Sequence, residues 1–171
     1  MRLPSICVVI LFVCCLLAIG AVAQQSDSGP ESASAYCTLS DGNEISIQYQ
    51  NSADVAKEEP HPGKIWLPGG TPITLFTQVP LTIANAVIPV GAYSLYVLPT
   101  KKDWTLIVNR NVTAGSSYDE KRDLVRARME MGQISAPAKQ LQISFAHMAP
   151  KLCGLRLYAG KIGAFVDFQE K

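Results

Sequence analysis

Short segments in which apolar and polar residues alternate, each ended by glycine or proline, are the feature that most constrains the fold of this chain. Side chains alternate between two faces along a β-strand, so a period of two predicts strands with one buried face. The alternation is clear in residues 91–109 (GAYSLYVLPTKKDWTLIVN), 139–147 (KQLQISFAH) and 153–168 (CGLRLYAGKIGAFVDF). No segment shows a sustained helical period. About nine short strands at this spacing predict an all-β domain, an antiparallel β-sandwich or a flattened barrel.

Residues 91–109 form a predicted hairpin whose two faces differ. Placing Val97 opposite Trp104 puts Tyr93, Trp104 and the aliphatic residues between them on one face, which we expect to lie in the core. Tyr96 falls on the other, semi-polar face with Thr105 and Asn109. Exposed aromatic side chains on a β-sandwich can hold a ligand. We therefore name Trp66, Tyr96, Thr105 and Asn109 as a candidate binding face.

The N-terminus has the pattern of a secretory signal peptide. Arg2 precedes an apolar run that ends in Ala21-Val22-Ala23, a small-residue cleavage site, before a polar stretch. We expect cleavage after Ala23, although an uncleaved membrane anchor is the alternative because the run is almost long enough to span a bilayer. Residues 24–35 are expected to be a flexible leader, and residues 36–171 a single β-sandwich domain. The protein is then secreted or periplasmic, with no stable membrane insertion after cleavage.

The charge balance does not point to nucleic acid or an anionic membrane as a partner. Without residues 1–23 the chain has 14 Lys plus Arg (15 − 1) and 14 Asp plus Glu. A formal net charge of zero gives no electrostatic reason to expect nucleic acid as a partner.

Two cysteines, Cys37 and Cys153, remain outside the signal peptide, and both fall on inward phases of their strands. In an exported chain they predict one disulfide that ties together the two ends of the domain. Two free buried thiols or a metal pair are the alternatives. Metal is the weaker of these, because no CxxC motif or nearby histidine accompanies either cysteine.

Residues with catalytic potential are few and scattered. His61 and His147 are the only histidines, and no GxSxG motif accompanies them. Glu58, Glu59 and His61 share one loop, but adjacent residues separated by proline converge poorly on an ion, so no metal site is predicted.

Charged runs have an equally simple interpretation. Asp119, Glu120 and Asp123 share a short run with Lys121 and Arg122, and solvated pairing is the ordinary explanation for such a run. Arg126, Arg128 and Arg156 fall on outward phases, where an anion site competes with a simple solvated face. No motif in the chain predicts a cofactor.

Several segments resemble a known family. The stretches CTLSDGNEISIQY, GKIWLPGGTPIT, IPVGAYSLYVLP, DWTLIVNRN and YDEKRDLVRARM occur in the order found in the bacterial exported family called domain of unknown function 2911. The resemblance covers residues 37–168 and implies an all-β exported domain with no established activity. The family-like residues are Gly63, Lys64, Trp66, Gly69, Thr74, Pro89, Gly91, Tyr93, Ser94, Leu95, Pro99, Trp104, Asn109, Tyr118 and Asp123.

One stretch departs from the family pattern. Members often carry Trp-Arg-x-Gly-Ala-Asn, whereas Leu67 stands here in place of the arginine and Gly70-Thr71 in place of Ala-Asn. If that stretch is a site in the family, this chain lacks its charged and amide groups.

These observations favour a non-catalytic binding or envelope-associated structural module over an enzyme. Its partner is expected to be a small molecule, a glycan or an envelope protein. The alternative is a hydrolase that acts on an envelope or carbohydrate substrate and recruits Asp119, Asp123 or His147.

Overall fold

A computed structural model describes residues 31–51 and 60–171 of the chain. The predicted signal peptide, its cleavage after Ala23 and the loop residues Glu58 and Glu59 lie outside the described residues. The described part contains no helix long and apolar enough to cross a membrane.

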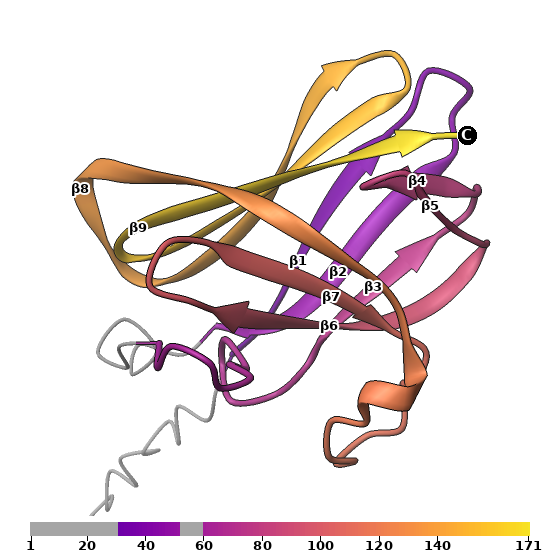
Figure 1. Cartoon of the computed structure of the whole chain (residues 1–171). Helices are drawn as coiled ribbons and strands as arrows, with labels where there is room; N and C mark the ends of the chain where they lie inside the picture. The colour runs from indigo at the N-terminus through magenta and orange to yellow at the C-terminus, as the bar shows by residue number, and fades with distance from the viewer. Residues whose placement is uncertain (1–30, 52–59) are drawn as a thin grey trace, which may run out of the picture.

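Nine β-strands form one continuous sheet in which all neighbours are antiparallel (Figure 1). Its order is β1-β2-β3-β6-β7-β8-β9-β4-β5. The strands are β1 (Glu31–Thr38), β2 (Glu44–Asn51), β3 (Ile73–Thr77), β4 (Leu81–Ile83), β5 (Ala86–Ile88), β6 (Gly91–Pro99), β7 (Trp104–Asn109), β8 (Asp123–Ala149) and β9 (Leu152–Glu170). A single 3-10 turn, η2 (Glu120–Arg122), is the helical element among the described residues. The predicted all-β class is confirmed, and β1 begins at Glu31, inside the segment we expected to be a flexible leader.

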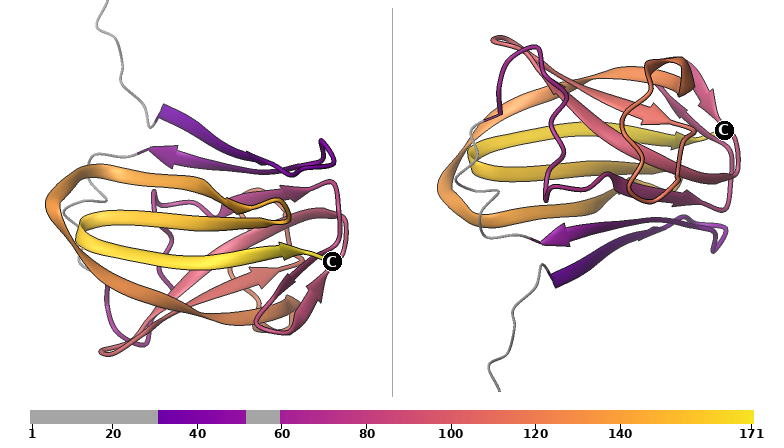
Figure 2. Two further views of the ribbon diagram at one scale, coloured as in Figure 1. Left: turned by 90° about the horizontal axis from the view of Figure 1, so that it is seen from above. Right: turned by 90° about the horizontal axis from the view of Figure 1, so that it is seen from below.

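Two of the strands are much longer than the alternation predicts, and they fold the sheet into two layers. β8 and β9 form a long hairpin that bends in its middle, where its register shifts around Ala138. β9 doubles back on itself at Gly160, so that its two halves lie side by side (Figures 1 and 2). The backbone N–H of Glu170 accordingly donates a hydrogen bond to the carbonyl of Lys151 over 2.8 Å. Bulges let a strand bend while it remains paired.

The core lies between the layer of β1, β2, β3, β6 and β7 and the layer of β9 and β4, with β8 passing from one layer to the other. Ile45, Leu75 and Leu95 line it from the first layer, and Leu155 and Phe168 line it from the second.

A disulfide between Cys37 on β1 and Cys153 on β9 crosses this interior, with a Cα–Cα distance of 6.3 Å. Both cysteines are buried, so the predicted bridge and its inward placement are confirmed.

The hairpin registers differ from the predicted ones by two residues. Val97 pairs with Leu106 rather than Trp104, and Cys37 pairs with Ile45. A shift of two preserves the face of every side chain, so Tyr93 and Trp104 lie in the core as predicted.

Candidate functional site

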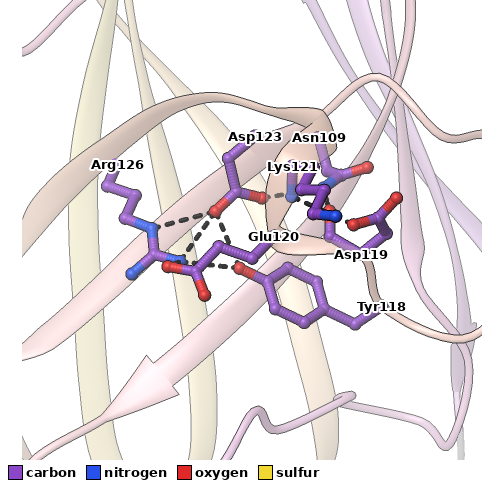
Figure 3. Close-up of polar contacts among 7 residues, drawn as sticks. All are labelled: Asn109, Tyr118, Asp119, Glu120, Lys121, Asp123 and Arg126. Atoms are coloured by element: carbon purple, nitrogen blue, oxygen red, sulfur yellow. Dashed lines mark hydrogen bonds and ion pairs between the residues drawn. The ribbon is translucent and has the colours of Figure 1, made fainter.

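A polar cluster joins the end of β7 to the start of β8 on the outer face of the sheet (Figure 3). We call it the Asp123 cluster. Asn109 is the last residue of β7, Asp123 is the first of β8, and the residues between them form the connection that carries η2. The members are Asn109, Tyr118, Asp119, Glu120, Asp123 and Arg126.

Asp123 is the centre of this cluster because both of its carboxylate oxygens accept hydrogen bonds. Oδ1 accepts from Asn109 Nδ2 over 2.7 Å. Oδ2 accepts from the Tyr118 hydroxyl over 2.7 Å and from Arg126 Nε over 2.9 Å. Three of the roughly four acceptor positions of this carboxylate are therefore occupied by partners within the protein.

Asn109 is fully buried, and its amide is satisfied from the same connection. Its Nδ2 also donates to the Asp119 carbonyl over 2.8 Å, and its Oδ1 accepts from the Asn111 N–H over 2.9 Å. Asp119 itself caps η2 by accepting from the N–H of Lys121. The polar groups therefore hold the connection against the sheet.

Tyr118 and Arg126 both have pKa values raised by their surroundings in the cluster. Burial, together with the hydrogen bond to Asp123, raises the pKa of Tyr118 to about 12. The hydrogen bond to Asp123 also raises the pKa of Arg126 above its usual range. General acid–base catalysis works best with a pKa near the operating pH, so neither group is suited to it.

The connection covers the outer face that carries Tyr96. The Tyr96 and Tyr118 rings meet edge to face, with centroids 5.0 Å apart, and Tyr96 is only 1 % exposed. Burial raises the pKa of the Tyr96 phenol, and its hydroxyl makes no hydrogen bond with the described residues.

The candidate binding face is consequently absent as an exposed surface. Trp66, Tyr96 and Asn109 are buried, and Thr105 is half-buried. Trp66 packs on the core side against Trp104, with ring centroids 5.2 Å apart, while Tyr96 lies on the opposite side of the sheet. Parity placed Tyr96 on the outer side of the sheet correctly, but it carries no information about what covers that side, and the grouping of Trp66 with Tyr96 on one face was wrong.

The two histidines lie apart from the Asp123 cluster. His61 is exposed in the loop before β3, and His147 is exposed on β8, where it pairs with Cys153. No group of three or more His, Cys, Asp or Glu side chains in the described ranges could hold a metal ion.

A hollow of about 650 Å³ opens on the surface where β8 bends. Sequence reasoning missed it, because it depends on the bend rather than on any motif. Its lining combines an aromatic ring, aliphatic side chains and two amides, and the residues are Ile134, Ser135, Ala136, Pro137, Ala138, Lys139, Gln140, Gln142 and Tyr158. Gln142 and Tyr158 face each other across the β8–β9 ladder. One feature of the sequence pointed to part of this lining: the polar face of residues 139–147, which places Gln140 and Gln142 outward.

The fold and the disulfide define an all-β, internally cross-linked class of domain. A family model described as "Protein of unknown function (DUF2911)" matches residues 31–166, and the chain belongs to this family. The resemblance read from the sequence motifs is thereby confirmed. Searches of the curated proteins and of the solved structures found no match.

Several family-like residues meet in the Asp123 cluster. Asn109, Tyr118 and Asp123 form its hydrogen bonds, and Ser94 donates to the Asn111 carbonyl over 2.8 Å beside it. In this chain, these four residues act in folding the connection onto the sheet.

Proposed function

We propose that this protein is an exported, non-catalytic binding module and that it binds a glycan in the hollow at the β8 bend. The signal-peptide pattern of residues 1–23 supports export, and so does the disulfide, since disulfides persist mainly in oxidising compartments.

The composition of the hollow is the observation that carries the proposal. The Tyr158 ring lines it together with the amides of Gln140 and Gln142, and the Gln140 Oε1 accepts a hydrogen bond from Asn51 Nδ2 over 3.3 Å. Sugar rings have apolar faces that pack on aromatic rings, and their hydroxyls pair with amide groups, which both donate and accept. A volume of about 650 Å³ also falls in the range of small-ligand sites.

The alternative, a hydrolase, receives less support from the arrangement of the acidic groups. Two-carboxylate hydrolysis needs one acid to donate a proton and another to act as a base or nucleophile. Asp123 is engaged by three donors, Asp119 caps η2, and His147 lies on another part of β8. These groups line none of the hollow.

A thermal-shift and calorimetric screen against chito-oligosaccharides, cellohexaose, hexagalacturonate and muropeptides tests the proposal. We expect a ligand-dependent rise in melting temperature that disappears in Tyr158→Ala. The matched control is Tyr36→Ala, because Tyr36 is 59 % exposed on β1 and lines none of the hollow. An equal loss in both variants, or no shift with any glycan, would overturn the proposal. Release of shorter sugars during incubation would favour the hydrolase.

A further inference from the structure

Arg156 lies on the outer face of β9, next to the hollow but outside its lining. It lies two residues before Tyr158 and therefore on the same face, and it pairs across the ladder with Ser144. Tyr158 and Phe165 meet edge to face with centroids 5.9 Å apart, and the Arg156 guanidinium lies 5.5 Å from the centroid of the Phe165 ring. A row of planar groups thus leads from Tyr158 over Phe165 to Arg156.

Arg156 forms no salt bridge with a carboxylate among the described residues. Its Nη2 donates only to the Met148 sulfur, over 3.3 Å, and its Nε is buried without a partner. Thioether sulfur is a weak acceptor, so most of the guanidinium's hydrogen-bonding capacity remains unused. By contrast, Arg126 and Arg128 each form salt bridges with aspartate.

The lack of a side chain at Gly163 allows the aromatic rings of this row to pack closely on the backbone. A Cβ there would come within 2.8 Å of the Phe165 ring and 3.4 Å of the Tyr158 ring, so both rings lean over the bare backbone. The Arg156 guanidinium rests in turn on Phe165. The cation is therefore positioned before any ligand arrives, which lowers the entropic cost of binding.

Two lysines lie at the Tyr158 end of this row, and two acids lie near Phe165. Lys139 lines the hollow, and Lys161 follows the reversal at Gly160. Two acids near Phe165 are Glu130, which pairs with it, and Asp167, whose Oδ1 lies against the backbone of Gly154. Neither acid forms a salt bridge with Arg156.

We infer that the bound glycan is acidic, with one sugar ring packed on Tyr158 and the carboxylate of a neighbouring uronic acid unit accepting hydrogen bonds from Arg156. This inference rests on the proposed function and names its ligand class. Arginine suits the role because its planar fork matches a carboxylate and it stacks on aromatic rings.

Calorimetric titration with hexagalacturonate and with its fully methyl-esterified form tests the inference, because the two differ only in the charge of the carboxyl groups. We expect the wild-type protein to bind the acid at least tenfold more tightly than the ester. Arg156→Gln should weaken binding of the acid by roughly 10-fold to 100-fold, the usual worth of a charged hydrogen bond, and change binding of the ester by less than twofold. Arg122→Gln, at the exposed last residue of η2, is the matched control.

The outcomes separate the inference from the proposed function. Equal affinity for acid and ester, or no effect of Arg156→Gln on the acid, overturns the inference and leaves the glycan site standing. Failure of both hexamers to bind overturns the inference, and the proposed function is overturned as well only if the other glycans of the thermal-shift screen also fail to bind. Equal binding of hexa-aspartate or of free sulfate would mean that Arg156 attracts any anion, which also overturns the glycan assignment. If Arg156→Gln folds poorly by circular dichroism, Lys139→Gln provides the second variant, with the same preferential loss of the acid expected.

Discussion

Asp123 shows how one side chain can fix a long connection. Its carboxylate receives hydrogen bonds from β7, from the connection and from β8, and its side chain is only 12 % exposed. Partial burial strengthens such charge-assisted bonds, whereas exposed pairs contribute little. These hydrogen bonds also keep Tyr96 buried, because they hold Tyr118 against its ring.

Removing the Asp123 carboxylate should therefore destabilise the protein more than removing an exposed one. Asp123→Ala leaves Asn109, Tyr118 and Arg126 without their shared acceptor, and we expect a loss of about 2–3 kcal/mol. Asp103→Ala is the control, because its partner Arg128 is 77 % exposed, and it should cost about 0–1 kcal/mol. Urea unfolding of the two variants measures the difference. Similar losses would show that the cluster does not hold the connection.

Tyr118 should make stability fall in alkaline solution. Its pKa is about 12 in the folded protein against an ordinary value of 10.0, so the folded state keeps a proton that the unfolded chain releases. This contribution is complete below pH 10 and is lost as the pH rises from 10 through 12. Tyr118→Phe should be less stable than wild type at pH 8, yet lose less additional stability between pH 10 and 12. Parallel declines in the urea midpoints of the two proteins would contradict this origin.

At the scale of elements, alternation predicted faces but not registers. Tyr93, Leu95 and Cys37 point inward as their parity requires, although both hairpins are shifted by two residues from the predicted pairing. Register depends on the turn, and the β6–β7 turn is closed by a side chain: Thr100 Oγ1 donates to the Asp103 carbonyl and accepts from the Asp103 N–H. With this local bonding, Pro99 and Trp104 form the pair that closes the hairpin. Each of them lies one residue later in the chain than the predicted pair, Leu98 and Asp103.

Replacing Gly69 with alanine should destabilise the protein more than the same replacement at Gly42. Gly42 and Gly69 both have φ of +85°, so alanine is strained at either position. A Cβ at Gly42 meets open space, whereas one at Gly69 overlaps the backbone carbonyl oxygen of Gln50 on β2. We expect Gly42→Ala to cost about 1–2 kcal/mol and Gly69→Ala about 1–3 kcal/mol more. Equal melting temperatures for the two variants would refute the close approach of this loop to β2.

At the scale of the whole molecule, the bent β8–β9 hairpin and the disulfide determine the two-layered shape. The all-β class and the cross-link follow from alternation and from the two cysteines. The bend does not, because it arises where continuous strands change register, and such bulges leave no clear pattern in residues 133–142. The hollow formed by the bend was unpredictable for the same reason, and so was the cover over Tyr96.

Reduction of the disulfide should weaken the whole fold. The cysteines are 116 residues apart in sequence, and closing a loop of this size is worth about 4–5 kcal/mol in the chain-entropy model. Unfolding by urea with and without a reductant should show a loss of this order in the wild-type protein. The Cys37→Ala/Cys153→Ala double variant is the control and should not respond to the reductant. If the stability of the wild-type protein were also unchanged by the reductant, the disulfide between Cys37 and Cys153 would be contradicted.

Mapping the binding site by nuclear magnetic resonance tests the central claim, that the outer-face hollow is the functional site, most directly. Titration of the isotope-labelled protein with hexagalacturonate should shift the backbone signals of Gln142, Tyr158, Gly163 and Phe165 most strongly, with little change in residues 109–126. Shifts centred on Asp123 and Tyr118, or no shifts at all at millimolar sugar, would contradict the account.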